Sequence, residues 1–455
     1  MKKIVITITF IATSIIFNVA KNFLPPNFYG IEFYSLLFLF DILCLHLISS
    51  LASINKNAKL LLIIYFLPFA LLVLVASLGI FYPLPDWNTY FKIIINTLLF
   101  SSLFAHIIFN ITVLIAWIAN NWRNKLKIPP KHYKHLPKNS KRKNKTHYFE
   151  FKTHTSQFLL KLGAAISCCI LITCFTAIFT WTKNINLTEI KINCEKIPNG
   201  FDTYKIVQLS DIHSDYQYND KLMGKAVEII NKQNADIILI TGDFISYKSS
   251  ELNPLINRLK ELNSKDGIYL VLGNHDYGTY YHWKNDSHKN KNFNDLLNYF
   301  KGLNWTLLRN ESIYLVKDND TLILVGTEHY SRSKSHYPSN ANIELALENI
   351  PNSIPIIAMT HNPDYWADKI RFMDNPILLT FSGHTHGMQI GFTGKSKKTN
   401  LYCLKNRYSA GLYEYNNKYL YINTGFGTVG FPFRIGIKPE ISVVTISKST
   451  SSLSN

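Results

Sequence analysis

The sequence predicts a mixed α/β domain with two packed sheets in its C-terminal part, preceded by about five transmembrane helices. Two observations support this fold class. Apolar residues are concentrated before Lys183, in stretches long enough to cross a bilayer, whereas the later part has the mixed composition of a soluble α/β protein. From Leu187 onward, short β-rich runs alternate with helical patterns. At 455 residues the chain is also too long for one ordinary domain.

Five apolar stretches approach the length of roughly 20 residues that crosses a bilayer. They are Ile4–Ala20, Phe33–Ala52, Leu60–Tyr82, Ile93–Ala119 and Phe158–Trp181. Core helices of soluble proteins seldom keep such long runs apolar on all faces, so we expect the last four stretches to be transmembrane helices. For the first stretch, Lys2 and Lys3 leave a signal sequence open as the alternative.

Basic residues set the expected orientation of these helices. Between the fourth and fifth stretches, a single acid, Glu150, faces a run of lysines and arginines that begins at Arg123 and ends at Lys152. The positive-inside rule makes this loop cytoplasmic, and Lys2 and Lys3 place the N-terminus on the same side. Five crossings then put everything after Trp181 outside the cytoplasm.

The same basic loop accounts for much of the formal net charge of +18. Attraction to anionic lipid headgroups is a sufficient explanation for basic residues beside membrane spans. A nucleic-acid partner is not expected, because no aromatic stacking platform accompanies the Lys141-Arg142-Lys143 run.

These patterns divide the chain into five regions. We expect a four-span transmembrane region over 1–120, a basic cytoplasmic loop over 121–157, a fifth transmembrane helix over 158–182, the α/β domain over 183–448 and a flexible tail over 449–455.

Within the α/β domain, strands and helices alternate. The predicted strands are Glu189–Asn193, Lys205–Ser210, Asp236–Thr241, Ile268–Leu272, Ser312–Val316, Leu322–Gly326, Ile354–Met359, Ile377–Ser382, Tyr419–Asn423 and Ser442–Ile446. The predicted helices are Lys221–Lys232, Leu252–Leu262, Asn294–Phe300, Ile343–Ile350 and Pro363–Arg371. Wholly apolar strands such as Ile237–Ile240 indicate sheets that are covered on both faces.

Most of the polar motifs directly follow apolar runs. These motifs are Asp211-Ile212-His213, Gly242-Asp243, Gly273-Asn274-His275-Asp276, His361-Asn362-Pro363 and Gly383-His384-Thr385-His386-Gly387. Residues two apart in an extended segment project to the same side, so Asp211 and His213 can address one ion. Asp243 can approach closely enough to bridge two ions. Such a pair of ions clamps a phosphoryl oxygen and activates a bridging water, so the set predicts a two-metal hydrolase.

The weight of the separate motifs differs. Asp-x-His and Gly-Asp occur by chance on loops and turns. Gly-Asn-His-Asp is more specific, and Gly-His-Thr-His-Gly is the most specific, because two histidines between glycines have little packing purpose. The ordered occurrence of all five motifs therefore favours a site over chance.

Together these motifs resemble the signature of the calcineurin-like metallophosphoesterase family over Tyr204–Ile446. The sequence around these motifs is most similar to the bacterial membrane-associated YkuE-like branch. The residues that carry this similarity are His361-Asn362-Pro363-Asp364, Gly425-Phe426-Gly427-Thr428, Arg434, Pro439 and Glu440. A membrane-spanning leader before such a domain is similar to the transmembrane metallophosphoesterase-domain proteins.

The resemblance implies a four-layer α/β/β/α sandwich that holds two divalent metal ions, with manganese, iron and zinc all suitable. It implies that Asp211, His213 and His386 hold one ion, that Asp243 bridges, and that Asn274, His361 and His384 hold the other. His275 is then the catalytic histidine, with Asp276 as a possible orienting partner.

One position departs from the family pattern. The family often has Gly-Asp-x-x-Asp where this chain has Gly242-Asp243-Phe244-Ile245-Ser246, so Ser246 replaces a supporting carboxylate. Because Asp243 is intact, we expect the site to be tuned and not lost.

We expect the protein to be a phosphoesterase. It would be a multi-pass protein of the cell (inner) membrane, with its catalytic domain on the extracytoplasmic side. It would hydrolyse a phosphomonoester, phosphodiester or pyrophosphate, and the anchor favours a phospholipid or lipid-linked substrate. A UDP-diacylglucosamine-type pyrophosphatase is the alternative if the domain is cytoplasmic, and a catalytically inactive membrane receptor or scaffold is the other. The sequence does not indicate an oligomeric state.

Two further segments could contribute to the site. Tyr277–Asn292 follows the catalytic histidine and would cap the site or form a solvated loop. Lys395, Lys397 and Lys398 could meet phosphate or lipid headgroups, or form a solvated turn.

Overall fold

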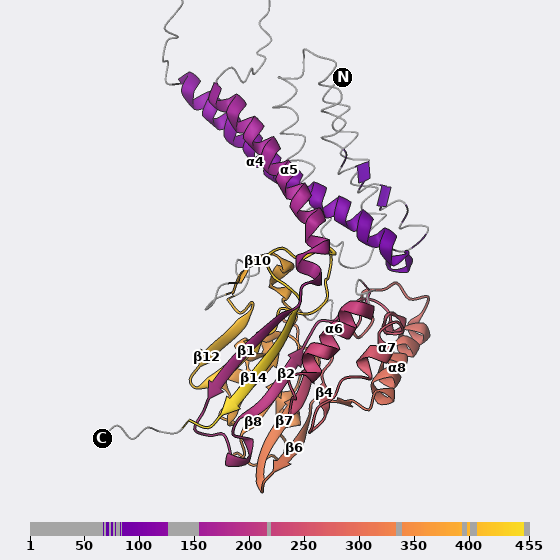
Figure 1. Ribbon diagram of the computed structural model, residues 1–455, viewed down its shortest axis with the longest axis vertical. Helices are drawn as coiled ribbons and strands as arrows, with labels where there is room; N and C mark the ends of the chain where they lie inside the picture. The colour runs from indigo at the N-terminus through magenta and orange to yellow at the C-terminus, as the bar shows by residue number, and fades with distance from the viewer. Residues whose placement is uncertain are drawn as a thin grey trace, which may run out of the picture. The chain divides into compact units, whose positions relative to one another are not determined.

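The computed structural model describes residues 84–125, 154–215, 220–333, 339–393, 398–400 and 407–449, with single residues between 67 and 82 (Figure 1). The chain divides into two compact units, Met1–Phe175 and Thr176–Asn455. The predicted boundaries of the basic loop, the fifth helix and the tail stay predictions.

The described part of the first unit consists mainly of long apolar helix. After the short 3-10 helix η2 (Leu84–Asp86), α4 covers Thr89–Lys125 and α5 covers His154–Phe179, continuing into the second unit. Both contain segments long and apolar enough to cross a membrane, Thr89–Ala119 and Phe158–Lys183. Only 39% and 17% of their most apolar windows are buried, unlike the core helix of a soluble protein.

These two helices correspond to the fourth and fifth predicted spans. The first two predicted spans and most of the third lie outside the described residues, so the bundle of five helices stays a prediction. Where α4 and α5 meet, the Ser167 hydroxyl donates to the carbonyl of Ala105 at 2.8 Å. A Cβ on Gly163 would lie 2.0 Å from the Thr112 hydroxyl, so glycine allows the close approach.

The second unit is built on two six-stranded sheets (Figure 1). The first has the order β1-β14-β2-β3-β4-β5, formed by Asn186–Asn193, Glu440–Ser447, Tyr204–Leu209, Ile237–Ile240, Ile268–Leu270 and Thr306–Leu307. The second has the order β12-β13-β9-β8-β7-β6, formed by Gly411–Tyr415, Lys418–Ile422, Ile377–Ser382, Ile356–Met359, Asp320–Gly326 and Glu311–Lys317. A two-stranded sheet pairs β10 (Gly391–Thr393) with β11 (Lys398–Asn400).

Short helices connect these strands. The α-helices are α6 (Asp220–Asn231), α7 (Ile256–Leu259), α8 (Asp286–Gly302), α9 (Ile343–Ala346) and α10 (Pro363–Asp368). The 3-10 helices are η3 (Trp181–Lys183), η4 (Asn199–Phe201), η5 (Ser249–Leu252), η6 (Ile370–Phe372) and η7 (His386–Gln389).

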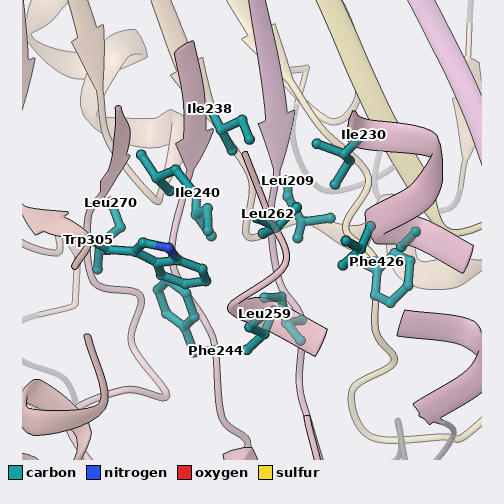
Figure 2. Packing of buried hydrophobic residues seen from close by; sticks show 14 of the residues in the cluster. Leu209, Ile230, Ile238, Ile240, Phe244, Leu259, Leu262, Leu270, Trp305 and Phe426 are labelled. Atoms are coloured by element: carbon teal, nitrogen blue, oxygen red, sulfur yellow. The ribbon is translucent and has the colours of Figure 1, made fainter. Parts of the chain in front are cut away.

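Alternation along β3 shows how the apolar strands serve two cores. Ile238 and Ile240 pack with residues of α6, α7 and α8, and Figure 2 shows Ile240 next to Trp305. Ile237 and Leu239 belong instead to a cluster with β7, β8 and β9 of the other sheet. A third cluster joins that second sheet to α9 and α10. The predicted mixed α/β fold with two sheets is thereby confirmed.

Several predicted helices have different limits in the structure: the one predicted over Ile343–Ile350 ends at Ala346, and the one predicted over Pro363–Arg371 is divided into α10 and η6. The helix predicted over Asn294–Phe300 begins earlier, at Asp286, where the Asn285 side chain accepts a hydrogen bond from the His288 backbone N–H at 3.1 Å. This first part is polar and has no helical apolar period, so the end of Tyr277–Asn292, for which a solvated loop was one of two interpretations, is helix. The helix predicted over Leu252–Leu262 is divided into η5 and α7 around Pro254.

Candidate metal centre

The predicted site residues lie just after the carboxyl ends of five strands. In the first sheet, β2, β3 and β4 are parallel neighbours and lead to Asp211, Asp243 and Asn274. In the second sheet, β8 and β9 are parallel and lead to His361 and His384. Because the carboxyl ends of parallel strands share one edge, the fold gathers side chains that lie far apart in the sequence.

The backbone at this edge is strained. Left-handed φ angles occur at non-glycine ligand positions, namely Asp211 (51°), His213 (43°), Asp243 (55°), His384 (71°) and His386 (50°). Such conformations cost on the order of 1 kcal/mol or more each and concentrate at functional sites. Neighbouring glycines leave room, since a Cβ on Gly273 would lie 2.0 Å from Asp243 Oδ1. Holding these side chains together therefore lowers the free energy of unfolding of the domain.

Three groups of side chains could hold a metal ion, each with its ligand atoms within 4.8 Å of one another. They are Asp211, His213 and His386; His213, Asp243 and His275; and Asp243, His361 and His384. All the Asp and His residues predicted as ligands fall in these groups.

Asp243 is common to two of the groups. Its Oδ2 lies 3.5 Å from His213 Nε2 and 3.2 Å from His361 Nε2, while Oδ1 accepts the backbone N–H of His275 at 2.9 Å. One oxygen of this carboxylate therefore faces histidines from both sides of the cluster. In the group of Asp211, His213 and His386, the Nε2 atom of His386 lies 3.3 Å from Asp211 Oδ1.

Asn274, after β4, lies at the same edge of the first sheet as Asp211 and Asp243. Its Nδ2 donates to the Tyr280 hydroxyl at 2.6 Å, whereas its Oδ1 is buried without a hydrogen-bond partner. An orphaned buried oxygen is costly unless something binds it. A divalent cation prefers such an oxygen beside carboxylates and imidazoles, so the donor set fits a metal ion.

Hydrogen bonds to the second ring nitrogen orient several histidines. His361 Nδ1 lies 2.7 Å from the carbonyl of Thr241, and His275 Nδ1 lies 2.8 Å from the carbonyl of Ser246. A carbonyl can only accept, so each of these Nδ1 atoms carries its proton and Nε2 is left toward the cluster.

The Ser246 side chain supports the first group of ligands. Its hydroxyl lies 3.2 Å from His213 Nδ1, and its backbone N–H donates to Glu251 at 2.7 Å. The position that departs from the family pattern therefore still contacts the predicted ligand His213, with a neutral hydroxyl in place of a carboxylate.

Asp276, predicted as a possible orienting partner of His275, contacts backbone donors in the structure. Its buried carboxylate accepts the backbone N–H groups of Asp243, Phe244, Ile245 and Gly273, at 2.8–3.3 Å. These bonds hold the turn that carries Asp243, and the carbonyl of Ser246 orients His275 instead. The Asp276 carboxylate reaches these backbone N–H groups because the turn that contains Gly242 and the turn that contains Gly273 approach each other closely.

Burial and mutual charge shift the histidine pKa values in opposite directions. Burial alone would lower the pKa of His361, but the adjacent Asp243 carboxylate outweighs it and raises that pKa to about 9. Burial, together with the charge of His361, lowers the pKa of His384 to about 3. At neutral pH this cluster therefore favours a proton on His361 and a neutral His384.

Two buried residues beside the cluster were not predicted from the sequence as site residues. Arg434 is fully buried, and its Nη2 lies 3.2 Å from His386 Nδ1 and donates to the carbonyl of Thr424 at 3.0 Å. His329 follows β7, and its ring centre lies 5.7 Å from that of His361. A polar pair, Glu328-His329, directly after an apolar strand is the same signal that marks the other motifs.

Comparison with known proteins identifies the family. Residues 204–388 match the model for calcineurin-like phosphoesterases, and this range contains all the predicted metal ligands. A B. subtilis protein, the uncharacterized metallophosphoesterase YkuE, is 30% identical over 276 residues, covering 58% of this chain and 86% of the relative. The chain belongs to the calcineurin-like phosphoesterase family.

Other relatives bear on the apolar N-terminal part. The Bos taurus transmembrane protein with metallophosphoesterase domain is 30% identical over 268 residues. The match covers 56% of this chain and 56% of the bovine protein, so it spans about half of that relative's length. Among solved structures, the NAD nucleotidase of Haemophilus influenzae shares 15% identity, with a TM-score of 0.33 over 49% of this chain and 50% of its own.

Proposed function

We propose that this family member is a membrane-anchored phosphoesterase that uses two divalent metal ions. The observation that carries the proposal is Asp243 Oδ2, which faces His213 on one side and His361 on the other. Asp211, His213 and His386 would hold one ion, and Asn274, His361 and His384 the other, with Asp243 between them. When bound, such ions supply Lewis-acid activation of a phosphoryl group and of water.

His275 would move the proton that the leaving oxygen needs. Its Nδ1–H is fixed on the carbonyl of Ser246, so Nε2 is the atom left to hold and release a proton. The ring is stacked on Tyr280 with a centroid distance of 3.9 Å, which prevents it from rotating away. Asp276 acts indirectly, by holding the backbone around Asp243.

Membrane anchoring is supported by α4 and α5, which are long and apolar enough to span a bilayer, and by relatives that are named as transmembrane proteins. We propose that the catalytic domain is extracytoplasmic and that its substrate is a phosphate ester carried by a lipid. The basic loop between the two helices is the support for this orientation.

The test is turnover of bis(p-nitrophenyl) phosphate and p-nitrophenyl phosphate by the purified full chain with added Mn²⁺. We expect metal-dependent hydrolysis that chelation abolishes. His275→Ala should lower turnover by about 10²–10⁴-fold, whereas His288→Ala, on the exposed start of α8, should leave it unchanged. Absence of metal-dependent turnover on both esters would contradict the proposal and favour a scaffold.

A further inference from the structure

The segment that follows the last metal motif carries two exposed apolar side chains. Phe392 on β10 is 81% exposed, and Met388 in η7 is 45% exposed. No other large apolar side chain in the described part of the chain is as exposed as Phe392. Exposed apolar side chains mark interaction sites when they form a contiguous patch.

The backbone that carries them is fixed. The Gly391 N–H donates to the carbonyl of Ile435 at 3.0 Å, and the Ile435 N–H donates to the carbonyl of Gln389 at 2.8 Å. The buried Gln389 amide also donates to the carbonyl of Phe431 at 2.9 Å. The exposure of Phe392 therefore does not follow from a loosely attached loop.

The same backbone connects this segment to the end of the apolar helix α5. The Arg434 N–H, one residue before Ile435, donates to the Thr182 hydroxyl at 2.9 Å. Thr182 lies at the end of the membrane-length segment Phe158–Lys183. Phe392 is thus two hydrogen-bonded contacts from the helix end, or roughly 10 Å at the usual spacing of paired segments.

The helix end has the composition of a membrane–water boundary. Phe179 is 69% exposed, and the Lys183 ammonium lies 5.2 Å from the centre of its ring. A lysine that follows an apolar run and an aromatic ring is typical of the interface, where the ring stays in the bilayer and the ammonium reaches water. A side chain held within roughly 10 Å of that level can reach the headgroup layer when it points toward the bilayer.

We propose that Phe392 and Met388 form a membrane-docking surface that inserts into the lipid leaflet beside the end of α5. This inference rests on α5 spanning the membrane, as proposed above. Lys395, Lys397 and Lys398 follow Phe392 in the sequence, a composition that favours anionic lipid headgroups. A phospholipid surface suits this combination better than an apolar protein face.

The surface also connects to the metal cluster. Met388 follows the ligand His386 by two positions, and Arg434 contacts both Thr182, through its backbone, and His386, through its guanidinium. Docking would therefore hold the cluster close to the headgroup layer, where the phosphate of a membrane lipid lies. The substrate class that fits is a phosphate ester on a lipid.

The direct test is photo-crosslinking in the full chain reconstituted into phosphatidylcholine–phosphatidylglycerol vesicles with alkyne-tagged acyl chains. Phe392 is replaced by p-benzoylphenylalanine, and the matched control carries the same replacement at Val316, which is 70% exposed on β6. Figure 1 shows β6 at the end of the domain remote from β10. We expect a phospholipid adduct at position 392 that is several-fold stronger than at 316.

Equal labelling at both positions, or an adduct only with protein, would overturn the proposal. A second measurement uses the variant Phe392→Asp. Its turnover of a vesicle-borne phosphate ester should fall by about tenfold, because the variant loses the binding free energy of one aromatic side chain buried in the bilayer. Turnover of a soluble diester should stay unchanged. Wild-type turnover of that soluble diester tests the proposed function separately, so a missing lipid adduct with normal turnover would remove only the docking surface.

Discussion

The two sides of the proposed metal cluster share Asp243 but differ in how their proposed ligands are supported. On one side, His361 is held by a backbone carbonyl at 2.7 Å and Asn274 by the Tyr280 hydroxyl at 2.6 Å. On the other side, His213 contacts only the Ser246 hydroxyl, at 3.2 Å, through its second nitrogen, among the contacts that the structure describes.

The side supported by Ser246 also faces a cation. The Arg434 guanidinium lies 3.2 Å from His386 Nδ1, and burial lowers its pKa only to about 10, so it stays charged at neutral pH. A positive charge beside a ligand opposes a divalent ion, and a hydroxyl orients imidazole more weakly than a carboxylate does. We infer that the ion at Asp211, His213 and His386 is bound more weakly than the ion at Asn274, His361 and His384.

The largest expected effect breaks both sides at once. Asp243→Asn removes the charge that both would use, so we expect turnover to fall more than about a thousandfold, a small part of the acceleration that enzymes reach. Both ions should bind more weakly in a metal titration. Asp295→Asn, an exposed carboxylate on α8 paired with Lys291, is the matched control and should behave as wild type. Full activity of Asp243→Asn would refute the shared role.

The next effect is a pH dependence of metal affinity that we expect at the site with His361 and not at the other site. The pKa of His361 in the metal-free cluster is about 9, so below that pH a metal ion must displace one proton there. Affinity of the tighter site for Mn²⁺ should therefore rise about tenfold per pH unit up to pH 9 and then level off. The measurement is calorimetric titration at several pH values, with proton release read from buffers of different ionisation enthalpy. A flat profile below pH 9 would contradict the assignment.

The same shift has a consequence for stability. A pKa raised above its ordinary value of about 6.5 stabilises the metal-free protein below pH 6.5, and this contribution is lost as pH rises through 9. Thermal unfolding after chelation should show that loss in the wild type and not in His361→Gln.

The smallest expected effect is a gain in affinity at the site that we infer to bind its ion more weakly. Ser246→Asp restores the carboxylate that the family often has, beside His213. We expect the weaker ion to bind roughly tenfold more tightly, within the usual range for outer partners of metal ligands. Affinity at the other site should change little. Ser264→Asp, in a loop before β4, provides a charge-matched control, and an equal gain in that variant would point to net charge as the cause.

The sequence was sufficient for the parts that depend on local pattern. Apolar strands such as Ile237–Ile240 and the polar motifs after them were predicted in place, because the strand period and the motif order are both local properties. The mixed α/β fold followed from the same alternation. The start of α8 was missed because Asn285 caps a polar first turn that shows no apolar period.

Contacts between distant segments could not be predicted in this way. Asp276 serves the backbone of Asp243–Ile245, although the motif suggested a partner for the neighbouring His275. Arg434 reaches His386 from a different loop, and nothing local at Arg434 indicates that contact. Such roles depend on which turns meet at the sheet edge, and that is a property of the packed fold.

The central claim, two unequal ions that share Asp243, is tested most directly by titrating the chelated full chain with Mn²⁺ in a calorimeter. The account predicts two ions per chain with clearly separated affinities, and it predicts that Ser246→Asp narrows the gap between them. One ion per chain, or two ions of equal affinity that Ser246→Asp leaves unchanged, would contradict it.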